Sequence, residues 1–369
     1  MALSDQFSGD GPFRMVGLMS GTSLDGLDMC MVEFRKIVKK QPKKPTRNSW
    51  TYRLLASETV PYKGSPWAEE LPRAYTATGD ALDAISRAYA TWVNEVAKAF
   101  IENSGWTPDA LASHGHTVLH QPDKGITRQI GNDALLANGI GMPVVCDFRN
   151  ADVKRGGQGA PLVPAVDALL FADYAICLNL GGFSNASWQS DGQRFAGDLG
   201  PVNILLNPLA QKVGEPYDNR GLRAANGRIH HGLLEAFKTI PFYQKAFPKS
   251  LGREWADQHF LHHLKDLSVD DALATCTEHS AWAISHALKG LPAGKVLVTG
   301  GGLYNDHLMH RIQVLSNRQL LVPDDQVIQC KEALSFAMLG LLRLRDEVNI
   351  LASVTGGERD ASDGVIHIG

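Results

Sequence analysis

The sequence lacks a long apolar run, because no stretch of 18 hydrophobic residues occurs anywhere in its 369 positions. A membrane-spanning helix needs about 20 such residues, so the sequence predicts none. Residues 1–13 are polar and acidic, without the basic start and apolar stretch of a secretory signal. We therefore expect a cytoplasmic protein that does not enter a membrane.

Cysteines are few, widely spaced and odd in number, and no two of them form a Cys-x-x-Cys pair. Disulfide frameworks and structural zinc sites need cysteines at matched spacings. The sequence therefore argues against both and predicts buried thiols in a reducing compartment. The five positions are Cys30, Cys146, Cys177, Cys276 and Cys330.

Neither sign of charge dominates, because 36 lysines and arginines stand against 39 aspartates and glutamates, for a formal net charge of -3. This balance argues against a protein whose main partner is nucleic acid or an anionic membrane. One basic run, from Arg35 to Arg47, departs from it. We interpret the run as a solvated loop between two strands, and the alternative is a patch for nucleic acid or membrane.

What the sequence does contain is an alternation of strand and helix patterns over a length suited to about two domains. Three apolar or alternating stretches in succession predict an antiparallel meander, and apolar spacings of three and four predict helices. Such alternation indicates α/β layers around mixed sheets. The expected strands are 15–19, 27–34, 50–57, 143–148, 175–180 and 295–299, and the expected helices are 82–100, 280–288 and 332–345.

The order strand, glycine turn, strand occurs at residues 15–34 and again at residues 175–188. This echo is one of pattern and not of sequence identity. It suggests two similar lobes, and lobes that face one another would place a ligand in the cleft between them.

A turn rich in glycine and hydroxyl residues, Ser20–Gly26, joins the first two expected strands. The backbone N–H groups of such a turn form a concavity that attracts phosphate. Asp25 and Asp28 would repel phosphate unless Mg²⁺ lay between them. The alternative is an ordinary strand-to-strand turn, which also favours Gly and Asp. The chain has no P-loop, so nucleotide binding would use another fold.

Two further segments suggest a binding site on the same grounds. Gly300–Gly302 follow an expected strand, where glycines allow the backbone to approach a flat ligand such as a purine or a ribose, and the alternative is a tight strand-to-helix turn. Asp198 is flanked by glycines and followed by Pro201. It is either a general base held in a cleft or an Asx-turn residue that bonds its own backbone.

The histidines His114, His116 and His120 suggest a metal site, because the first two would share one face of a strand. No carboxylate lies within this run, and Gly115 indicates a role for the backbone. We therefore favour a polar strand end that faces a substrate, with the metal site as the alternative.

Polar residues also follow the expected buried strand 143–148. Arg149, Asp152 and Gln158 supply the donors and acceptors that a sugar needs, at the strand end where open α/β sheets bind ligands. The alternative is an ion pair that steadies a loop.

Gly182–Ala186 nearly matches the nucleophile elbow of serine hydrolases, with Ser184 as nucleophile, but no compelling Asp and His follow it.

Together these segments resemble the anhydro-N-acetylmuramic acid kinases, of the superfamily that includes sugar kinases, actin and the heat-shock ATPases. The resemblance covers nearly the whole chain. Its most specific parts are GLMSGTSLDG at 17–26 and GGQGAPLVP at 156–164. Matching segments also occur at 113–122, 147–155, 179–187, 197–203, 298–306, 331–340 and 353–357.

The resemblance implies an actin- or hexokinase-like α/β fold with two ribonuclease H-like lobes and a cleft between them. The first lobe would hold residues 1–170 and 341–369, and the second residues 171–340. The implied enzyme uses ATP, Mg²⁺ and water to open 1,6-anhydro-N-acetylmuramic acid, a cell-wall sugar, and to phosphorylate its O6. The products are N-acetylmuramic acid 6-phosphate and ADP. The resemblance also implies a homodimer.

The same resemblance assigns the site residues, with Asp198 as the catalytic base. The ATP phosphates would bind at Ser20, Gly21, Thr22, Ser23, Leu24, Asp25 and Gly26 and at a second loop with Gly181, Gly182 and Asn185. The adenosine would lie near Gly300, Gly301 and Gly302. The sugar pocket would contain Arg149, Asp152, Gln158, His114 and Glu332. The alternative for Glu332 is a helix-start residue, where a carboxylate favours the helix dipole.

Three positions depart from the family pattern. The usual Asp-Thr-Gly-Pro-Gly-Asn has Leu199 in place of Thr and Val202 in place of the second Gly, and Asn207 stands where Asp is common. We expect these changes to affect sugar contacts more than the reaction. Two rival functions remain at this point: a serine hydrolase that uses Ser184, and a nucleotide-dependent binding protein of the actin or heat-shock type.

Overall fold

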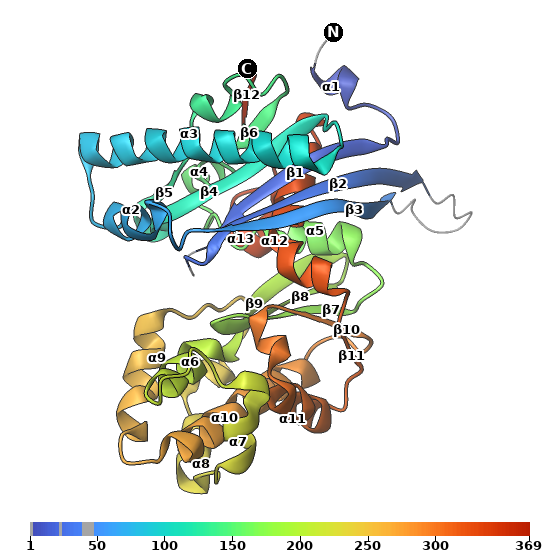
Figure 1. Ribbon diagram of the computed structural model, residues 1–369. Helices are drawn as coiled ribbons and strands as arrows, with labels where there is room; N and C mark the ends of the chain where they lie inside the picture. The colour runs from blue at the N-terminus through green and yellow to red at the C-terminus, as the bar shows by residue number, and fades with distance from the viewer. Residues whose placement is uncertain (1–2, 22–23, 39–47) are drawn as a thin grey trace. The chain divides into compact units, whose positions relative to one another are not determined.

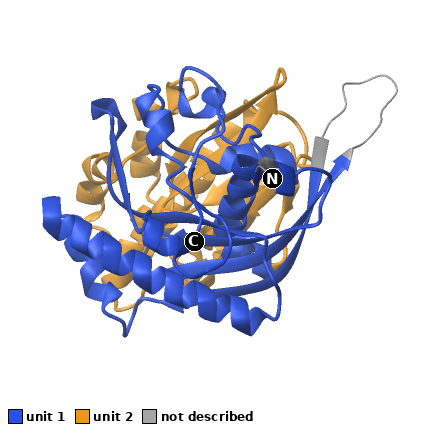
Figure 2. Cartoon of the chain, turned by 90° about the horizontal axis from the view of Figure 1, so that it is seen from above, with its two compact units in different colours: residues 1–170, 325–369 blue, residues 171–324 orange. Residues whose placement is uncertain are grey.

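The computed structural model describes residues 3–21, 24–38 and 48–369, so most of the basic run lies outside the described residues. The chain forms two compact units (Figure 2). The first unit contains residues 1–170 and 325–369, and the second contains residues 171–324. The first unit is therefore built from both ends of the chain, whereas the second is one continuous segment.

Among the described residues, the first unit contains a seven-stranded sheet in the order β12-β6-β4-β1-β2-β3, with β5 beside β4 (Figure 1). As predicted, β1, β2 and β3 form an antiparallel meander, whereas β1, β4 and β6 run parallel. The strands are β1 (Phe13–Ser20), β2 (Gly26–Val38), β3 (Asn48–Pro61), β4 (Ala110–Gln121), β5 (Ile126–Ile130), β6 (Val144–Cys146) and β12 (Val365–His367).

Helices α3 and α12 cover opposite faces of this sheet. Alternate residues of β1 explain the arrangement, since Val16 and Leu18 pack into the cluster that contains α3, and Met15 packs into the one that contains α12. Gly17 lies so close to α12 that a Cβ there would be 1.9 Å from the carbonyl oxygen of Ala333. The helices are α1 (Leu3–Gln6), α2 (Trp67–Ala74), α3 (Gly79–Ser104), α4 (Asn150–Lys154), α5 (Val163–Leu170), α12 (Asp325–Leu344) and α13 (Ala352–Thr355).

The second unit contains a five-stranded sheet in the order β11-β10-β7-β8-β9. Helix α10 packs against β9 and against α6, α7, α8 and α11. The strands are β7 (Ile176–Leu180), β8 (Phe183–Ser190), β9 (Gln193–Pro201), β10 (Val296–Thr299) and β11 (Leu320–Leu321). The helices are α6 (Asn203–Gln211), α7 (Leu222–Asn226), α8 (His231–Lys238), α9 (Arg253–His259), α10 (Val269–Lys289) and α11 (Asp306–Ser316).

The two sheets share one topology. The meander β1-β2-β3 corresponds to β7-β8-β9, which is also antiparallel, and the parallel neighbours β4 and β6 correspond to β10 and β11. This order is that of a ribonuclease H-like lobe. The internal echo of the sequence is therefore confirmed, and the chain has the two-lobed α/β fold that was predicted.

One expected boundary differs from the structure. Residues 325–340 were expected in the second lobe, but they belong to the first unit because α12 packs along β1, β2 and β4. The expected buried thiols are confirmed, since all five cysteines are buried and carry free thiol groups. Within the described ranges, no helix is both long and apolar enough to cross a membrane.

Candidate functional site

The predicted phosphate turn connects β1 to β2 and is tightly closed. The backbone N–H of Leu24 donates to the carbonyl oxygen of Gly21 at 3.3 Å, and Leu24 has a φ of +60°. Asp25 is exposed at the end of the turn, next to the buried Gly26. Thr22 and Ser23 lie outside the described residues, so a role for their hydroxyl groups stays a prediction.

The hydroxyl of Ser20 turns inward, contrary to our expectation that all three hydroxyls of this turn serve as phosphate donors. Its side chain is 2% exposed. The Oγ atom lies 2.6 Å from Tyr62 Oη and 2.9 Å from His116 Nδ1. The side chain of Ser20 therefore anchors the start of the turn to the interior.

Asp28 is the second acidic residue near this turn. Its Oδ1 accepts a hydrogen bond from Thr59 Oγ1 at 2.6 Å. Burial raises the pKa of the Asp28 carboxyl, and the charge of Asp25 raises it further. Two carboxylates that raise each other's energy are favourable neighbours for a divalent cation, and Mg²⁺ is usually held by one or two carboxylates together with substrate phosphates. Asp25 and Asp28 therefore fit the magnesium that the resemblance implies.

Arg149, which follows β6, interacts with two other residues predicted at the sugar site, His114 and Glu332. Its Nε donates to His114 Nε2 at 2.9 Å, and its Nη1 donates to the carbonyl oxygen of Gly159 at 2.6 Å. Burial lowers the pKa of Arg149 to about 10, so it stays charged at neutral pH, and the charge of Glu332 opposes the lowering. Burial and Arg149 hold the pKa of His114 well below its usual value, so the ring is neutral and can accept the bond.

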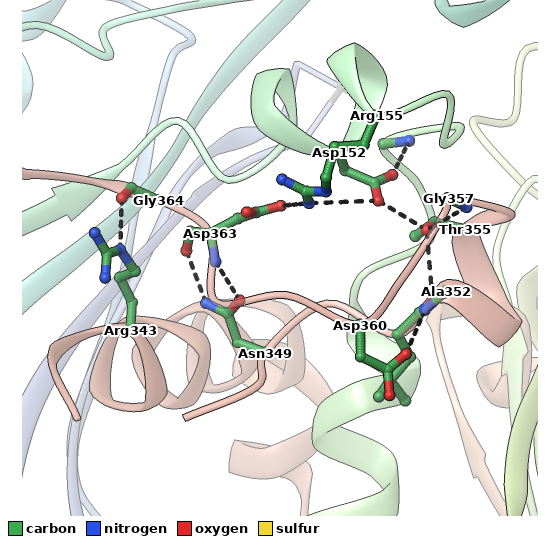
Figure 3. Close-up of polar contacts among 12 residues, drawn as sticks. Asp152, Arg155, Arg343, Asn349, Ala352, Thr355, Gly357, Asp360, Asp363 and Gly364 are labelled. Carbon is green, nitrogen blue, oxygen red and sulfur yellow. Dashed lines mark hydrogen bonds and ion pairs between the residues drawn. The ribbon is translucent and has the colours of Figure 1, made fainter. Parts of the chain in front are cut away.

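Asp152 does not face a ligand, although we expected it in the sugar pocket. It is fully buried, and both oxygens are occupied (Figure 3). Its Oδ2 accepts from the backbone N–H of Gly159 at 2.8 Å, and its Oδ1 accepts from Thr355 Oγ1 at 2.9 Å. A Cβ on Gly157 would lie 2.2 Å from Asp152 Oδ2, so glycine is required there. Asp152 thus organises the loop Gly156–Gly159 from within.

Residues of the C-terminal segment also hold the loop Gly156–Gly159 in place. The backbone N–H of Gln158 donates to the carbonyl oxygen of Thr355 at 2.7 Å, and the side chain of Gln158 is exposed. Arg155 pairs with Asp363, and Asn349 exchanges hydrogen bonds with the backbone of Asp363 (Figure 3). The conformation of the glycine loop is therefore set by residues far along the chain.

Glu332 lies inside α12 and not at its start, because the helix begins at Asp325. The helix-start alternative for Glu332 is therefore wrong. The residue is exposed to solvent. Desolvation by the surrounding protein raises the pKa of its carboxyl, the charge of Asp28 raises it further, and the charge of Arg149 opposes both. These couplings put Glu332 within the electrostatic reach of both Asp28 and Arg149.

In the second unit, Asp198 lies on β9 beside the segment that follows α8. Its backbone N–H donates to the carbonyl oxygen of Lys249 at 2.9 Å, and its Oδ2 accepts from the backbone N–H of Leu251 at 2.7 Å. The other carboxylate oxygen accepts no hydrogen bond from the described residues. Asp198 is half-buried, and this burial raises its pKa to about 6. One oxygen is thus anchored, and the other can take up a proton.

The glycine turn between β7 and β8 packs on the start of α6. The carbonyl oxygen of Gly182 accepts from the backbone N–H groups of Val202 and Ile204, at 2.9 and 3.0 Å. A Cβ on Gly182 would meet only Ile204, at 3.9 Å, and Asn185 follows on β8, half-buried. Gly181 donates its own N–H to the carbonyl oxygen of Phe183 at 3.2 Å. The turn therefore has an open face, as a phosphate loop requires.

The triple glycine after β10 divides into two structural positions and one open position. Gly300 has a φ of +86°, and a Cβ there would lie 2.5 Å from Asn179 Oδ1. A Cβ on Gly302 would lie 2.8 Å from Leu180 Cβ, whereas Gly301 has no atom within 4 Å of that position. Gly301 alone leaves space for a ligand, as the adenosine prediction requires.

The serine hydrolase alternative has no support in the structure. Ser184 is fully buried, and its Oγ donates to the carbonyl oxygen of Gly200 at 3.0 Å. Its hydroxyl therefore bridges β8 and β9 inside the unit and cannot attack a substrate. Leu199 and Val202 are buried as well, at 1% and 0% exposure, so both departures from the family pattern fill the core and do not contact a sugar directly.

The expectation that His114 and His116 share one face of a strand is wrong. The His114 ring packs on Phe336 of α12, whereas the His116 ring lies near Tyr89 of α3. The two helices cover opposite faces of the sheet. Within the described ranges, no group of three or more His, Cys, Asp and Glu residues is arranged to hold a metal ion. The histidine metal site is therefore not supported.

Sequence reasoning missed several residues that hold the site. The backbone N–H of Leu251 and the carbonyl oxygen of Lys249 leave no signal in a sequence, because any residue supplies them. Thr355 lies within the matching segment 353–357, but nothing in the sequence shows that its partner is Asp152.

Comparison with known proteins gives one consistent result. The family model described as anhydro-N-acetylmuramic acid kinase matches residues 13–369. A Pseudomonas fluorescens protein named anhydro-N-acetylmuramic acid kinase is 36% identical over 371 residues, which cover 93% of this chain and 96% of that protein. A Pseudomonas putida protein of the same name is 38% identical over 352 residues, 88% of this chain and 91% of that protein.

Proposed function

Because the chain belongs to the anhydro-N-acetylmuramic acid kinase family, we propose that it opens 1,6-anhydro-N-acetylmuramic acid with water and phosphorylates the released oxygen with ATP. Water adds to the anomeric carbon, the bond from that carbon to O6 breaks, and O6 takes the γ-phosphoryl group. The water proton passes to a base. The products are N-acetylmuramic acid 6-phosphate and ADP.

Asp198 is the base in this proposal, and its environment is the observation that carries it. A pKa of about 6 leaves the carboxylate ionised at neutral pH, yet more basic than an ordinary aspartate. The bond from Leu251 orients the group, while its second oxygen is open to a water molecule. Glycoside cleavage usually needs a second carboxyl group to protonate the leaving oxygen. In this proposal the leaving oxygen accepts the γ-phosphoryl group in place of a proton, so one carboxylate is sufficient.

The two glycine turns and the acidic pair are assigned to the nucleotide. Backbone N–H groups of Ser20–Gly26 and of Gly181–Gly182 would receive the phosphates, and the open position at Gly301 would lie next to the adenosine. Asp25 and Asp28 would hold Mg²⁺, which neutralises charge on the phosphates during transfer. These assignments rest on the tight turn geometry and on the raised pKa of Asp28.

The sugar is assigned to Arg149, Gln158 and Glu332, and the buried His114 belongs to the same site as the residue that holds Arg149. Arg149 uses Nε and Nη1 within the protein, and its Nη2 has no partner among the described residues. A half-buried, charged guanidinium with a donor to spare suits the carboxylate of a muramic acid. Asp152 and Thr355 position the loop that carries Gln158 and do not contact the sugar themselves.

One assay tests this function against its rivals. The protein is incubated with Mg-ATP and 1,6-anhydro-N-acetylmuramic acid in heavy-oxygen water, and the product is examined by mass spectrometry. We expect a 6-phosphorylated sugar that carries the label at its anomeric hydroxyl. Sugar opening without ATP would favour a hydrolase, and ATP binding without any phosphorylated sugar would favour a binding protein.

Asp198→Asn provides the matched test of the base. This variant keeps the bond from Leu251 and should lose nearly all turnover. Asp191→Asn is the control, because Asp191 is an exposed aspartate in the turn that leads into β9, and it should turn over normally. Full turnover by Asp198→Asn would remove Asp198 from the mechanism.

The proposal also places the enzyme in the cytoplasm and makes it a homodimer. The cytoplasm supplies ATP and suits five buried thiols. The resemblance also supports a homodimer, which light scattering coupled to gel filtration would test against the 40.1 kDa monomer.

A further inference from the structure

Strand β4 sends two neighbouring histidines to opposite faces of the first sheet, and Gly115 between them is the cause. In a regular strand, residues two apart point to the same face. Gly115 has a φ of +74°, and a Cβ there would lie 2.7 Å from both Ile130 O and Asn132 Oδ1. The pairing of β4 with β1 is irregular between Leu18 and Ser20, at the same level. A glycine bulge therefore separates His114 from His116.

His116 is the centre of a buried chain of hydrogen bonds that ends on the phosphate turn. Its Nδ1 lies 2.9 Å from Ser20 Oγ, and its Nε2 lies 3.2 Å from Tyr75 Oη. Beyond Ser20, the chain continues through Tyr62 Oη at 2.6 Å to Tyr89 Oη at a further 2.6 Å. His116 and Tyr62 are fully buried, whereas Tyr75 is 42% exposed. Both ring nitrogens of His116 are thus engaged.

This chain fixes the point from which the phosphate turn starts. Ser20 is the last residue of β1, and its pairing with Leu27 of β2 closes the turn. Because the Ser20 hydroxyl is bonded on both sides, the residue cannot rotate without breaking two buried hydrogen bonds. A buried polar group that loses its partner is costly. The position of Ser20, at which the turn begins, is therefore set by His116.

His114 acts on the other face through Arg149. The neutral His114 ring accepts the Nε hydrogen of Arg149, and its Nδ1 lies 2.9 Å from the carbonyl oxygen of Gly115. The ring also packs on Phe336, with centroids 4.6 Å apart. These contacts hold the guanidinium in one orientation, with Nη1 on Gly159. The bulge thus gives each histidine a different residue to orient.

We propose that the His114-Gly115-His116 segment is a positioning element for both substrates: His116, through Ser20, sets the nucleotide turn, and His114, through Arg149, sets the sugar site. The inference rests on the proposed function. Neither histidine contacts a substrate in it. A purely structural role would make the loss of either histidine affect both substrates alike, whereas a positioning role separates them.

The test compares His116→Leu with His114→Leu in steady-state kinetics on the whole enzyme. Losing hydrogen bonds of ordinary strength should raise the affected KM by about tenfold. His116→Leu should raise KM for ATP and leave KM for the sugar within about twofold, and His114→Leu should do the reverse. His116→Gln and His114→Gln keep a donor and an acceptor and should recover most of the loss. His120→Gln, on the same strand, is the control and should match the wild type.

A binding measurement keeps this inference separate from the proposed function. Titration calorimetry with Mg-ADP should show weaker binding for His116→Leu and unchanged binding for His114→Leu. If the wild type binds Mg-ADP but phosphorylates no anhydro sugar, the proposed function fails. The Mg-ADP titration of His116→Leu would still test whether His116 positions the nucleotide turn. If His116→Leu does not fold, Tyr62→Phe removes the next hydroxyl of the chain and should weaken Mg-ADP binding in the same direction. Equal changes in both KM values, or none in either, would overturn the inference.

Discussion

Burial raises the pKa of the Asp198 carboxyl, and this shift predicts how activity depends on pH. A pKa of about 6 means that the base is ionised above this pH and protonated below it. We therefore predict that kcat/KM falls as the pH drops through about 6, by about tenfold per pH unit on the acid side. A pH-rate profile measured at subsaturating sugar checks this. A flat profile from pH 7 down to 5 would contradict it.

The same burial should make Asp198 a weak point for stability. Its pKa of about 6 in the folded protein lies above the ordinary value of an aspartate, so the ionised form opposes folding, and the free energy of unfolding falls as the pH rises from about 4 to about 6. Asp198→Asn should be more stable than the wild type at pH 8, by about 1–2 kcal/mol after allowance for its partial exposure. At pH 3.5 the two should unfold alike.

Urea unfolding at the two pH values measures this difference. Asp191→Asn is the control again, because an exposed aspartate should give the same small change at both. A variant that is less stable than the wild type at pH 8 would show that the ionised Asp198 is compensated in the folded protein.

Thr355 offers a test of the loop that carries Gln158. Thr355→Val removes the hydroxyl that bonds Asp152 Oδ1 and keeps the shape of the side chain. We predict a loss of about 1 kcal/mol in the free energy of unfolding, because a buried carboxylate oxygen loses its partner. KM for the sugar should rise severalfold while KM for ATP stays constant. Thr355→Ser keeps the hydroxyl and should behave as the wild type.

At the level of single residues, the sequence predicted which side chains suit a chemical role better than it predicted which groups those side chains contact. Asp198 and Arg149 were identified as candidates, and both have environments that suit their proposed roles. Asp152 was assigned to the sugar and is instead a buried support. The reason is that its partner, Thr355, lies 203 residues away in the chain, and only the fold brings the two together. The inward turn of Ser20 depends in the same way on Tyr62 and His116.

At the scale of the elements, α12 lies very close to the first sheet at Gly17. A methyl group there would overlap the backbone of Ala333, so Gly17→Ala must push α12 away. Because the obstacle is backbone and not the end of a flexible side chain, we predict a loss of about 1–3 kcal/mol in unfolding free energy, or more. Gly301→Ala is the stability control, because no atom lies within 4 Å of the new Cβ. Urea midpoints of the two variants make the comparison.

The elements themselves were largely predictable, since apolar periodicity located β1, β2, β3, β7, β10 and α3. Helix starts were not. Helix α10 begins at Val269 and not near residue 280, because Ser268 caps it by accepting from the backbone N–H of Asp271 at 3.1 Å. The first turns of α10 and α12 are more polar than their centres, so periodicity detected only the later turns. The bulge at Gly115 was also not predicted. The rule that residues two apart in a strand share a face fails where a glycine with a positive φ interrupts the strand.

At the scale of the whole molecule, the chain leaves the first unit at residue 170 and returns to it at residue 325. The second unit is continuous, so we predict that residues 171–324 fold as an isolated fragment. Residues 1–170 should not, because without α12 the cluster around Met15, Val32 and Phe34 loses its cover. Circular dichroism with urea unfolding tests both fragments. A cooperative transition from residues 1–170 would contradict the prediction.

The return of the chain to the first unit also has a consequence during synthesis. On the ribosome, most strands of the first sheet emerge early, but one face lacks α12 until residues 325–369 follow, after the whole of the second unit. Domains generally fold as they are translated, and exposed apolar sheets are prone to aggregation while they wait. The nascent chain should therefore depend on chaperones throughout the translation of residues 171–324, and rare codons placed there would prolong that dependence.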